Sequence, residues 1–399
     1  MFFRDIRHQD RAIGLIRAAL ESGRMPHALL FHGPDGVGKE LTASALAARL
    51  LCKTANAEQG GMGLFGAVTP GLEACGECES CRLFGSGNHP DFQRVTRGLR
   101  KFHSDPTVRK SKGLFLVVDV VRQFLIEPAS RLPTVSPRRV FIIREAERMN
   151  EEAQNALLKT LEEPPGNACL ILISSSASRL LPTIRSRCAQ IEFARLPRGF
   201  VVEQLRALAR LNPADADWLA DLCDGRLGVA LQRHAAGLLE LRGALAEAWS
   251  LADRPVAFGQ SLLAAANELG GRLADLADAE DNAAAGIAPP AGGATPRGSA
   301  TADTDTADDD ASDDDSDEAG STGKTRGGSS KAPATDIQRD ALRVVFAVLS
   351  NEQRARLREN PSDAFDDADA AIAAVSRAEW MLERNVSPQL VCEALAVGA

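Results

Sequence analysis

The sequence predicts an α/β fold, in which a parallel sheet is followed by helical regions. Two short apolar runs rich in β-branched residues, Val140–Ile143 and Leu170–Ile173, have the length of buried strands. They flank a helix-like segment, Glu151–Glu162, and no hairpin signal separates the three. A strand, a helix and a strand in that order form a parallel βαβ unit. Towards the N-terminus, Ala28–His32 is another strand candidate that leads into a helix, Leu41–Leu51.

A glycine-rich loop joins these last two elements and has the pattern of a P-loop. Its characteristic residues are Gly33, Gly36, Gly38 and Lys39. In a P-loop the backbone N–H groups surround phosphates, and the lysine reaches the outer oxygens. The residue after the lysine should be Ser or Thr, whose hydroxyl helps to bind Mg²⁺, but here it is Glu40. We therefore expect a P-loop that binds ATP or ADP weakly or not at all.

The strand Val140–Ile143 ends with a second departure from the nucleotide-binding pattern. Such a strand should end in an Asp that positions Mg²⁺ and a Glu that polarises the attacking water. Here Arg144 stands in the Asp position and Glu145 follows. A guanidinium cannot coordinate a cation, so both departures remove ligands of the same ion. In open parallel sheets ligands bind outside the carboxyl ends of the strands, so we expect residues 144–147 and 174–176 to face one crevice.

Four of the eight cysteines are grouped and predict a structural metal site. Cys75, Cys78 and Cys81 lie in one short knuckle, and Cys52, at the end of the P-loop helix, can supply a fourth thiolate. Zinc prefers four thiolates in structural sites, which leaves no position open for catalysis. We expect Zn²⁺ to hold a module over residues 52–81; the alternative is a set of reduced free thiols.

A basic run follows this module over residues 94–112, and only Asp105 opposes it. Two interpretations stay open. The run contacts DNA phosphates, or it is a solvated surface loop; the second is favoured because the run lacks base-reading groups. Its members are Arg94, Arg97, Arg100, Lys101, Arg109, Lys110 and Lys112.

The stretch Asn155–Pro165, NALLKTLEEPP, followed by Ser186-Arg187-Cys188, resembles the clamp-loader branch of the AAA+ family. Its bacterial members include the delta-prime and gamma/tau subunits of DNA polymerase III. The resemblance covers roughly residues 1–240. It implies that Arg187 is an arginine finger, which acts in trans on the γ-phosphate of ATP bound to a neighbouring subunit. The other interpretation of Arg187 is an ion pair with a local carboxylate.

The resemblance also implies a division into domains. Residues 1–194 correspond to an AAA+ P-loop-type domain, 195–238 to a small helical lid, and 239–399 to an all-α C-terminal domain that forms an oligomerising collar in the family. The family's sensor 2 arginine position in the lid holds Gly228. Residues 279–335 are rich in Ala, Gly, Ser, Thr and Asp. Such a segment cannot bury enough apolar surface to offset its ordering entropy, so we expect a disordered acidic insertion there.

The net charge of −8 comes from this insertion. Residues 303–318 carry ten acidic and no basic side chains, so the remainder is near neutral and neither demands nor excludes nucleic acid. The sequence contains no run of 18 apolar residues, so no membrane span is predicted, and the N-terminus lacks the apolar core of a signal peptide. We expect a cytoplasmic protein.

Together with the residues missing from the nucleotide site, the resemblance implies a delta-prime-type clamp-loader subunit, a non-hydrolysing component of the DNA-directed DNA polymerase III holoenzyme that supplies an arginine finger during sliding-clamp loading. The implied partners are gamma/tau and delta subunits in a hetero-oligomer and, through them, the sliding clamp, the polymerase core and primed DNA. The alternative is an ATP-hydrolysing gamma/tau-type motor, against which Glu40, Arg144 and Gly228 argue. A standalone zinc-dependent DNA-binding protein would leave the Arg187 motif unexplained.

Overall fold

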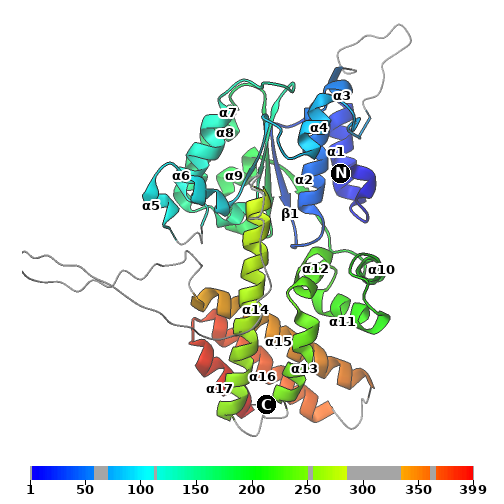
Figure 1. The fold of residues 1–399 in the computed structure, drawn as a ribbon, viewed down its shortest axis with the longest axis vertical. Coiled ribbons are helices and arrows are strands. Elements are labelled where there is room, and N and C mark those ends of the chain that lie inside the picture. Colours follow the sequence, from blue (N-terminus) through cyan, green and yellow to red (C-terminus); the bar gives the residue numbers. More distant parts are fainter. Residues whose placement is uncertain are drawn as a thin grey trace, which may run out of the picture.

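The computed structural model describes residues 2–57, 71–111, 115–249, 255–284, 334–359 and 365–398. The chain runs from a sheet domain through a group of short helices into a helical C-terminal region (Figure 1). Within the described ranges, none of the helices combines the length and the apolar character of a membrane span.

Five parallel strands form the sheet, in the order β2-β3-β4-β1-β5. Because β1, β4 and β3 are neighbours, their carboxyl ends lie side by side at one edge of the sheet. The predicted βαβ unit is confirmed, with helix α8 (Glu151–Glu162) between β3 and β4. The strands are β1 (Ala28–His32), β2 (Phe92–Val95), β3 (Arg139–Ile143), β4 (Ala168–Ser174) and β5 (Ala189–Glu192).

Alternate residues of the strands bury the two faces of the sheet under different helices. Leu29 and Phe31 of β1 join the core that α1 and α2 cover, whereas Leu30 joins the core under α6, α8 and α9. Both faces are therefore apolar, which explains why the strands read as continuous hydrophobic runs. The other helices of this domain are α1 (Asp10–Glu21), α2 (Lys39–Leu51), α3 (Lys53–Ala57), α4 (Glu79–Gly85), α5 (Pro106–Arg109), α6 (Val118–Val121), α7 (Glu127–Ala129) and α9 (Pro182–Arg187).

One segment of the sheet domain differs from the sequence expectation. The sequence predicts a helix over residues 117–126 that ends before Pro128. Instead, α6 is followed by a π-helical turn, Arg122–Ile126, and the helical backbone continues through Pro128 into α7. Pro128 lies in the first turn of α7, where its missing N–H needs no helical partner. A change in helix type, which the sequence pattern does not reveal, thus accommodates the proline.

Three short helices link the sheet domain to the C-terminal helices, as the predicted lid requires: α10 (Arg198–Leu208), α11 (Pro213–Cys223) and α12 (Leu227–Ala235). The C-terminal region holds α13 (Leu238–Trp249), α14 (Pro255–Ala284), α15 (Ala334–Glu359), α16 (Phe365–Glu383) and α17 (Pro388–Gly398). Helix α14 packs against α15 and α17 and extends from them up to the sheet domain (Figure 1). The predicted fold class, a P-loop-type parallel sheet with a helical lid and an all-α C-terminal region, is confirmed.

The expected boundary of the acidic insertion is wrong by six residues. Disorder was expected from residue 279, but α14 continues to Ala284. Carboxylates in its last two turns contact the sheet domain, and this contact supplies the stabilisation that local composition does not. Of the rest of the expected insertion, residues 285–333 lie outside the described residues, and residues 334 and 335 belong to the first turn of α15.

Candidate nucleotide site and cysteine cluster

A cavity of about 760 Å³ lies at the carboxyl ends of β1, β3 and β4. Its walls include P-loop residues, Arg144, Ser175 and Gly228 of α12. The predicted crevice is confirmed, because the Glu147 carboxylate accepts a hydrogen bond from the Ser175 N–H at 3.1 Å and a second from the Ser175 hydroxyl. The volume suits a small-molecule ligand, so size does not exclude a nucleotide. The charges around the cavity must decide what it can bind.

Lys39 is bonded to its own loop. Its Nζ atom donates to the carbonyl oxygens of Gly33 at 2.5 Å and Pro34 at 2.6 Å, and it lies 3.3 Å from the Asp35 carboxylate. The side chain is 5% exposed. Burial lowers the pKa of Lys39, and the neighbouring Asp35 carboxylate partly restores it. The ammonium that reaches phosphate oxygens in a P-loop is thus satisfied by the loop itself.

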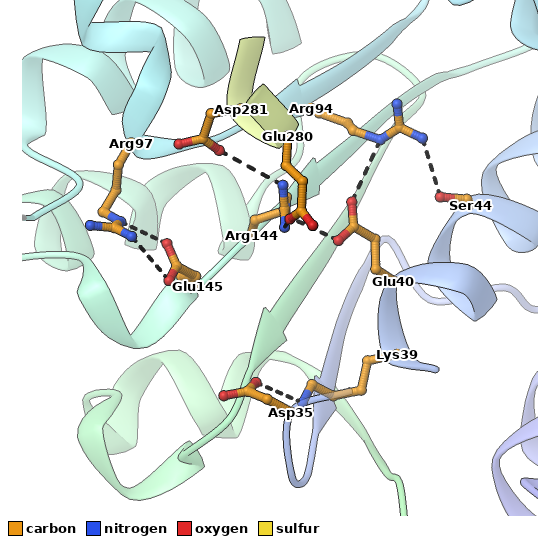
Figure 2. Close-up of polar contacts among 10 residues, drawn as sticks. All are labelled: Asp35, Lys39, Glu40, Ser44, Arg94, Arg97, Arg144, Glu145, Glu280 and Asp281. Carbon is orange, nitrogen blue, oxygen red and sulfur yellow. Dashed lines mark hydrogen bonds and ion pairs between the residues drawn. The ribbon is translucent and has the colours of Figure 1, made fainter. Parts of the chain in front are cut away.

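The two residues at the magnesium-binding positions pair with each other (Figure 2). Arg144 Nε lies 3.0 Å from Glu40 Oε2, and Arg94 approaches the other oxygen of Glu40 at 3.9 Å. Burial alone would lower the pKa of Arg144, but carboxylates, Glu40 foremost, outweigh burial and raise it. A guanidinium–carboxylate pair therefore stands where the nucleotide mechanism needs a hydroxyl and an aspartate.

Glu145, the candidate base, is held by an arginine as well. Arg97 donates from Nε to Glu145 Oε2 at 2.6 Å and from Nη2 to Oε1 at 3.1 Å (Figure 2). Glu145 has a left-handed backbone conformation, with φ of 48°. Such a conformation is uncommon outside glycine and asparagine and directs the side chain away from the regular strand path. The Glu145 carboxylate therefore forms an ion pair with Arg97, one of the basic residues beside the site.

The basic run is not a solvated loop over its first half, so that interpretation is wrong for residues 94–101. Arg94 belongs to β2, and Arg97, Arg100 and Lys101 lie in a 3₁₀ helix, Arg97–Phe102. Arg100 is 6% exposed, and its Nε donates to the Ser111 carbonyl at 3.1 Å. Lys112 lies outside the described residues. Contact of this run with DNA stays a prediction.

The lid packs directly on the P-loop. The Gly228 N–H donates to the Gly36 carbonyl at 2.8 Å. A Cβ atom added to Gly228 would lie 2.9 Å from Gly36 Cα, and one added to Gly36 would lie 2.5 Å from the Val229 nitrogen. The backbones of the P-loop and the lid are in direct contact here, so the sensor 2 position has no room for a side chain.

We expect Gly228→Ala to lower the free energy of unfolding by about 1–3 kcal/mol, because the new methyl group would overpack this contact. Denaturant titration of the full chain measures the effect. The matched control is Gly243→Ala in α13, where an added Cβ has no neighbour within 4 Å. Because alanine has a higher helix propensity than glycine, this control should leave the free energy of unfolding unchanged or raise it by about 1 kcal/mol. Equal effects of the two substitutions would contradict the packing of the lid on the loop.

Arg187 is the last residue of α9 and lies at the surface, with its side chain 34% exposed. Its Nε donates to Glu162 Oε1 at 2.7 Å, Nη2 makes a second contact with the same oxygen, and Nη1 donates to the Thr183 carbonyl at 3.1 Å. Within this single chain the guanidinium therefore has the local carboxylate partner that the second interpretation describes. The finger role concerns a neighbouring subunit and remains a prediction.

The four predicted cysteine ligands converge. Their Sγ atoms all lie within 4.8 Å of one another. Cys52 Sγ is 3.5 Å from that of Cys75 and 3.9 Å from that of Cys78, and Cys75 is 3.9 Å from Cys81. A tetrahedral zinc site with Zn–S bonds of about 2.3 Å places its sulfurs about 3.8 Å apart. The donor set and its spacing fit a structural metal ion.

Local hydrogen bonds prepare part of this cluster for metal binding. Burial raises the pKa of Cys75, but backbone N–H groups, that of Cys78 first, outweigh burial and lower it to about 6. Burial raises the pKa of Cys52 and of Cys81. Without a metal, Cys75 is thus a thiolate near neutral pH, while Cys52 and Cys81 retain their protons.

A buried histidine, which the sequence did not single out, ties the knuckle to the sheet. His89 Nε2 lies 2.8 Å from Ser80 Oγ and 3.0 Å from Ser136 Oγ, and both hydroxyls donate to the Leu51 carbonyl. The ring must therefore donate from Nε2, while Nδ1 accepts the Asp91 N–H at 3.0 Å. A neutral ring meets both demands, and burial lowers the pKa of His89 accordingly.

Comparison with known proteins places these features in a family. A family model described as DNA polymerase III, delta subunit, matches residues 8–197. The DNA polymerase III subunit delta' of Pseudomonas aeruginosa is 36% identical over 228 residues, which cover 55% of this chain and 60% of the relative. The same subunit of Escherichia coli is 30% identical over 63% of this chain and 66% of its own length. The subunit gamma/tau of Mycobacterium tuberculosis (strain H37Rv) is 34% identical over 49% of this chain but only 29% of its own length.

Proposed function

This chain belongs to the family of bacterial DNA polymerase III delta-prime subunits, and from that premise we propose that it is a non-hydrolysing member of the clamp loader. The matches span at most about two thirds of the curated relatives' length, so activity and partners are part of the proposal. In it, the chain supplies Arg187 to the ATP site of a neighbouring subunit and turns over no ATP itself. It serves as a scaffold during sliding-clamp loading.

The ion pair between Arg144 and Glu40 is the observation that carries this proposal. A P-loop ATPase needs Mg²⁺ to bridge the β- and γ-phosphates, and both positions that would hold the ion are occupied by residues that bind each other. The pair also places a carboxylate where the triphosphate's own negative charge would lie. Loss of magnesium binding removes charge neutralisation in the transition state, so the retained Lys39 alone does not restore hydrolysis.

The partners follow from the same role. An arginine that acts in trans requires a neighbour with an intact ATP site, which the gamma/tau type of subunit offers. A delta subunit, the sliding clamp, the polymerase core and primed DNA join through the assembly. Zn²⁺ would be held by Cys52, Cys75, Cys78 and Cys81, where it would supply structural cross-linking. Its site lies at the C-terminal end of α2, whereas the P-loop lies at the N-terminal end of that helix.

A steady-state ATPase assay on the isolated chain tests the proposal. We expect no turnover above background in the wild type, and the same result for Lys39→Ala. The double variant Glu40→Thr/Arg144→Asp, which restores both magnesium ligands, should bind Mg²⁺–ATP more tightly than the wild type. Wild-type turnover that Lys39→Ala abolishes would instead make this chain a motor of the gamma/tau type.

A further inference from the structure

The last two turns of α14, residues 278–284, contact the sheet domain through three carboxylates. Arg144 Nη2 lies 3.3 Å from Glu280, and Arg144 Nη1 lies 3.7 Å from Asp281. Lys101 Nζ lies 3.5 Å from Asp278. Figure 2 shows the end of α14 beside the pair of Arg144 and Glu40, with its acidic side chains directed at Arg144. A helix that begins among the C-terminal helices thus ends at the degenerate nucleotide site.

The backbone of the sheet domain is shaped to accept these turns. A Cβ atom added to Gly98 would lie 2.8 Å from Asp281 Cβ, so only glycine leaves room for the contact. The Asp281 side chain is 23% exposed, a low value for an acidic residue near the end of a helix. Burial raises the pKa of Asp281, while Arg144 and Arg97 oppose the rise. The carboxylate accepts partial burial because two guanidinium groups face it.

The sheet domain and the end of α14 carry opposite charges where they meet. We define the basic cluster as Arg94, Arg97, Arg100, Lys101 and Arg144. Within the sheet domain, Glu40 and Glu145 pair with three of its members, Arg94, Arg97 and Arg144. The last two turns of α14 bring three further carboxylates to Lys101 and Arg144, namely Asp278, Glu280 and Asp281.

We propose that the last two turns of α14 form an electrostatic latch, which fixes the C-terminal helices to the sheet domain at the site where a motor subunit would hold magnesium and phosphate. Arg144 has two roles in this arrangement. It removes a magnesium ligand, and it anchors the latch. The latch gives a subunit without a nucleotide a defined orientation of its C-terminal helices, with anionic side chains of the chain itself in place of phosphate.

Hydrogen exchange of the full-length chain, followed by mass spectrometry, tests the latch. The variant Asp278→Asn/Glu280→Gln/Asp281→Asn should exchange faster in residues 97–102 and in the last turns of α14, by on the order of tenfold, because three partly exposed ion pairs are lost. High salt should accelerate the same peptides in the wild type, since it screens such pairs. The matched control is Glu268→Gln, which removes a carboxylate of α14 that pairs within the helix with Arg272.

A charge swap makes the test specific. Arg144→Glu should open the latch, and Arg144→Glu/Asp281→Arg should close it again and restore slow exchange. Unchanged exchange of residues 97–102 in the triple variant, or no recovery in the swap while the sheet peptides stay protected, would overturn the proposal. Neither readout depends on ATP turnover, so failure of the latch and failure of the proposed function are distinguishable.

Discussion

An Arg187→Ala substitution is expected to slow ATP hydrolysis at the neighbouring subunit's site by about 10³- to 10⁵-fold, the range measured for arginine fingers. The cause is loss of a positive charge that stabilises the transferring phosphoryl group. Single-turnover hydrolysis in the reconstituted assembly, with clamp and primed DNA, measures it. Assembly itself should survive, because Arg187 lies at the surface and contributes nothing to either hydrophobic core.

The existing ion pair with Glu162 does not prevent this role. Both side chains are partly exposed, at 34% and 47%, and such surface pairs contribute only about 0–1 kcal/mol. A finger that accelerates hydrolysis by 10³- to 10⁵-fold stabilises the transition state by about 4–7 kcal/mol. The transition-state stabilisation exceeds the energy of the surface ion pair several-fold, so moving the guanidinium from Glu162 to a neighbour's phosphate would be favourable. In that case Glu162 would hold Arg187 at the surface until a neighbouring subunit binds.

Two controls separate a finger from a structural residue. Glu162→Gln removes the partner but leaves the guanidinium, and should change the rate by no more than about tenfold. Arg185→Ala removes a basic residue two positions earlier in α9, where the helix directs the side chain elsewhere. A rate unchanged by Arg187→Ala, or lowered equally by Arg185→Ala, would exclude the finger.

Features set by short stretches of sequence could be predicted. The unit of β3, α8 and β4 follows from apolar runs and a proline stop, and the glycine-rich loop follows from its own residues. The cysteine cluster could be predicted for the same reason. Three of its four ligands lie within seven residues, and their chemistry restricts them to few functions.

Features that depend on contacts between residues far apart in the sequence could not be predicted. Glu40 and Arg144 were recognised as two separate losses, but their pairing depends on the order of strands that brings β3 near the P-loop. The last two turns of α14 have the composition of a disordered segment, because their stability comes from Arg144 and Lys101, far away in the sequence. His89 gave no signal, since its side-chain partners, Ser80 and Ser136, lie 9 and 47 residues away in the sequence.

Substitution of one cysteine ligand is expected to abolish stoichiometric zinc binding. In Cys78→Ser, the hydroxyl stays protonated at neutral pH and is a poor replacement for a thiolate, so the site loses a charged ligand. Metal analysis of the purified full chain should give about one zinc for the wild type and far less for the variant. Proteolysis should become faster in the module, since metal binding energy is also folding energy for such small units.

Glu77→Gln is the matched control, because Glu77 lies exposed in the same knuckle and is not a ligand. Its zinc content should equal that of the wild type. Equal metal content in Cys78→Ser and the control would contradict the assignment.

The pH dependence of zinc binding gives an independent test of the same site. Zinc takes thiolates, so each protonated cysteine must release its proton when the metal binds. Cys75, whose pKa is lowered to about 6, is already ionised at pH 7, whereas burial keeps Cys52 and Cys81 protonated well above that pH. Cys52 and Cys81 alone account for two displaced protons, and Cys78, whose pKa is lowered by the backbone N–H of Cys81 against the effect of burial, adds at most one more. Zinc affinity should therefore rise by at least about a hundredfold between pH 7 and 8. A flat profile would show that the thiols are already ionised, and hence that burial does not control the cluster as the structure indicates.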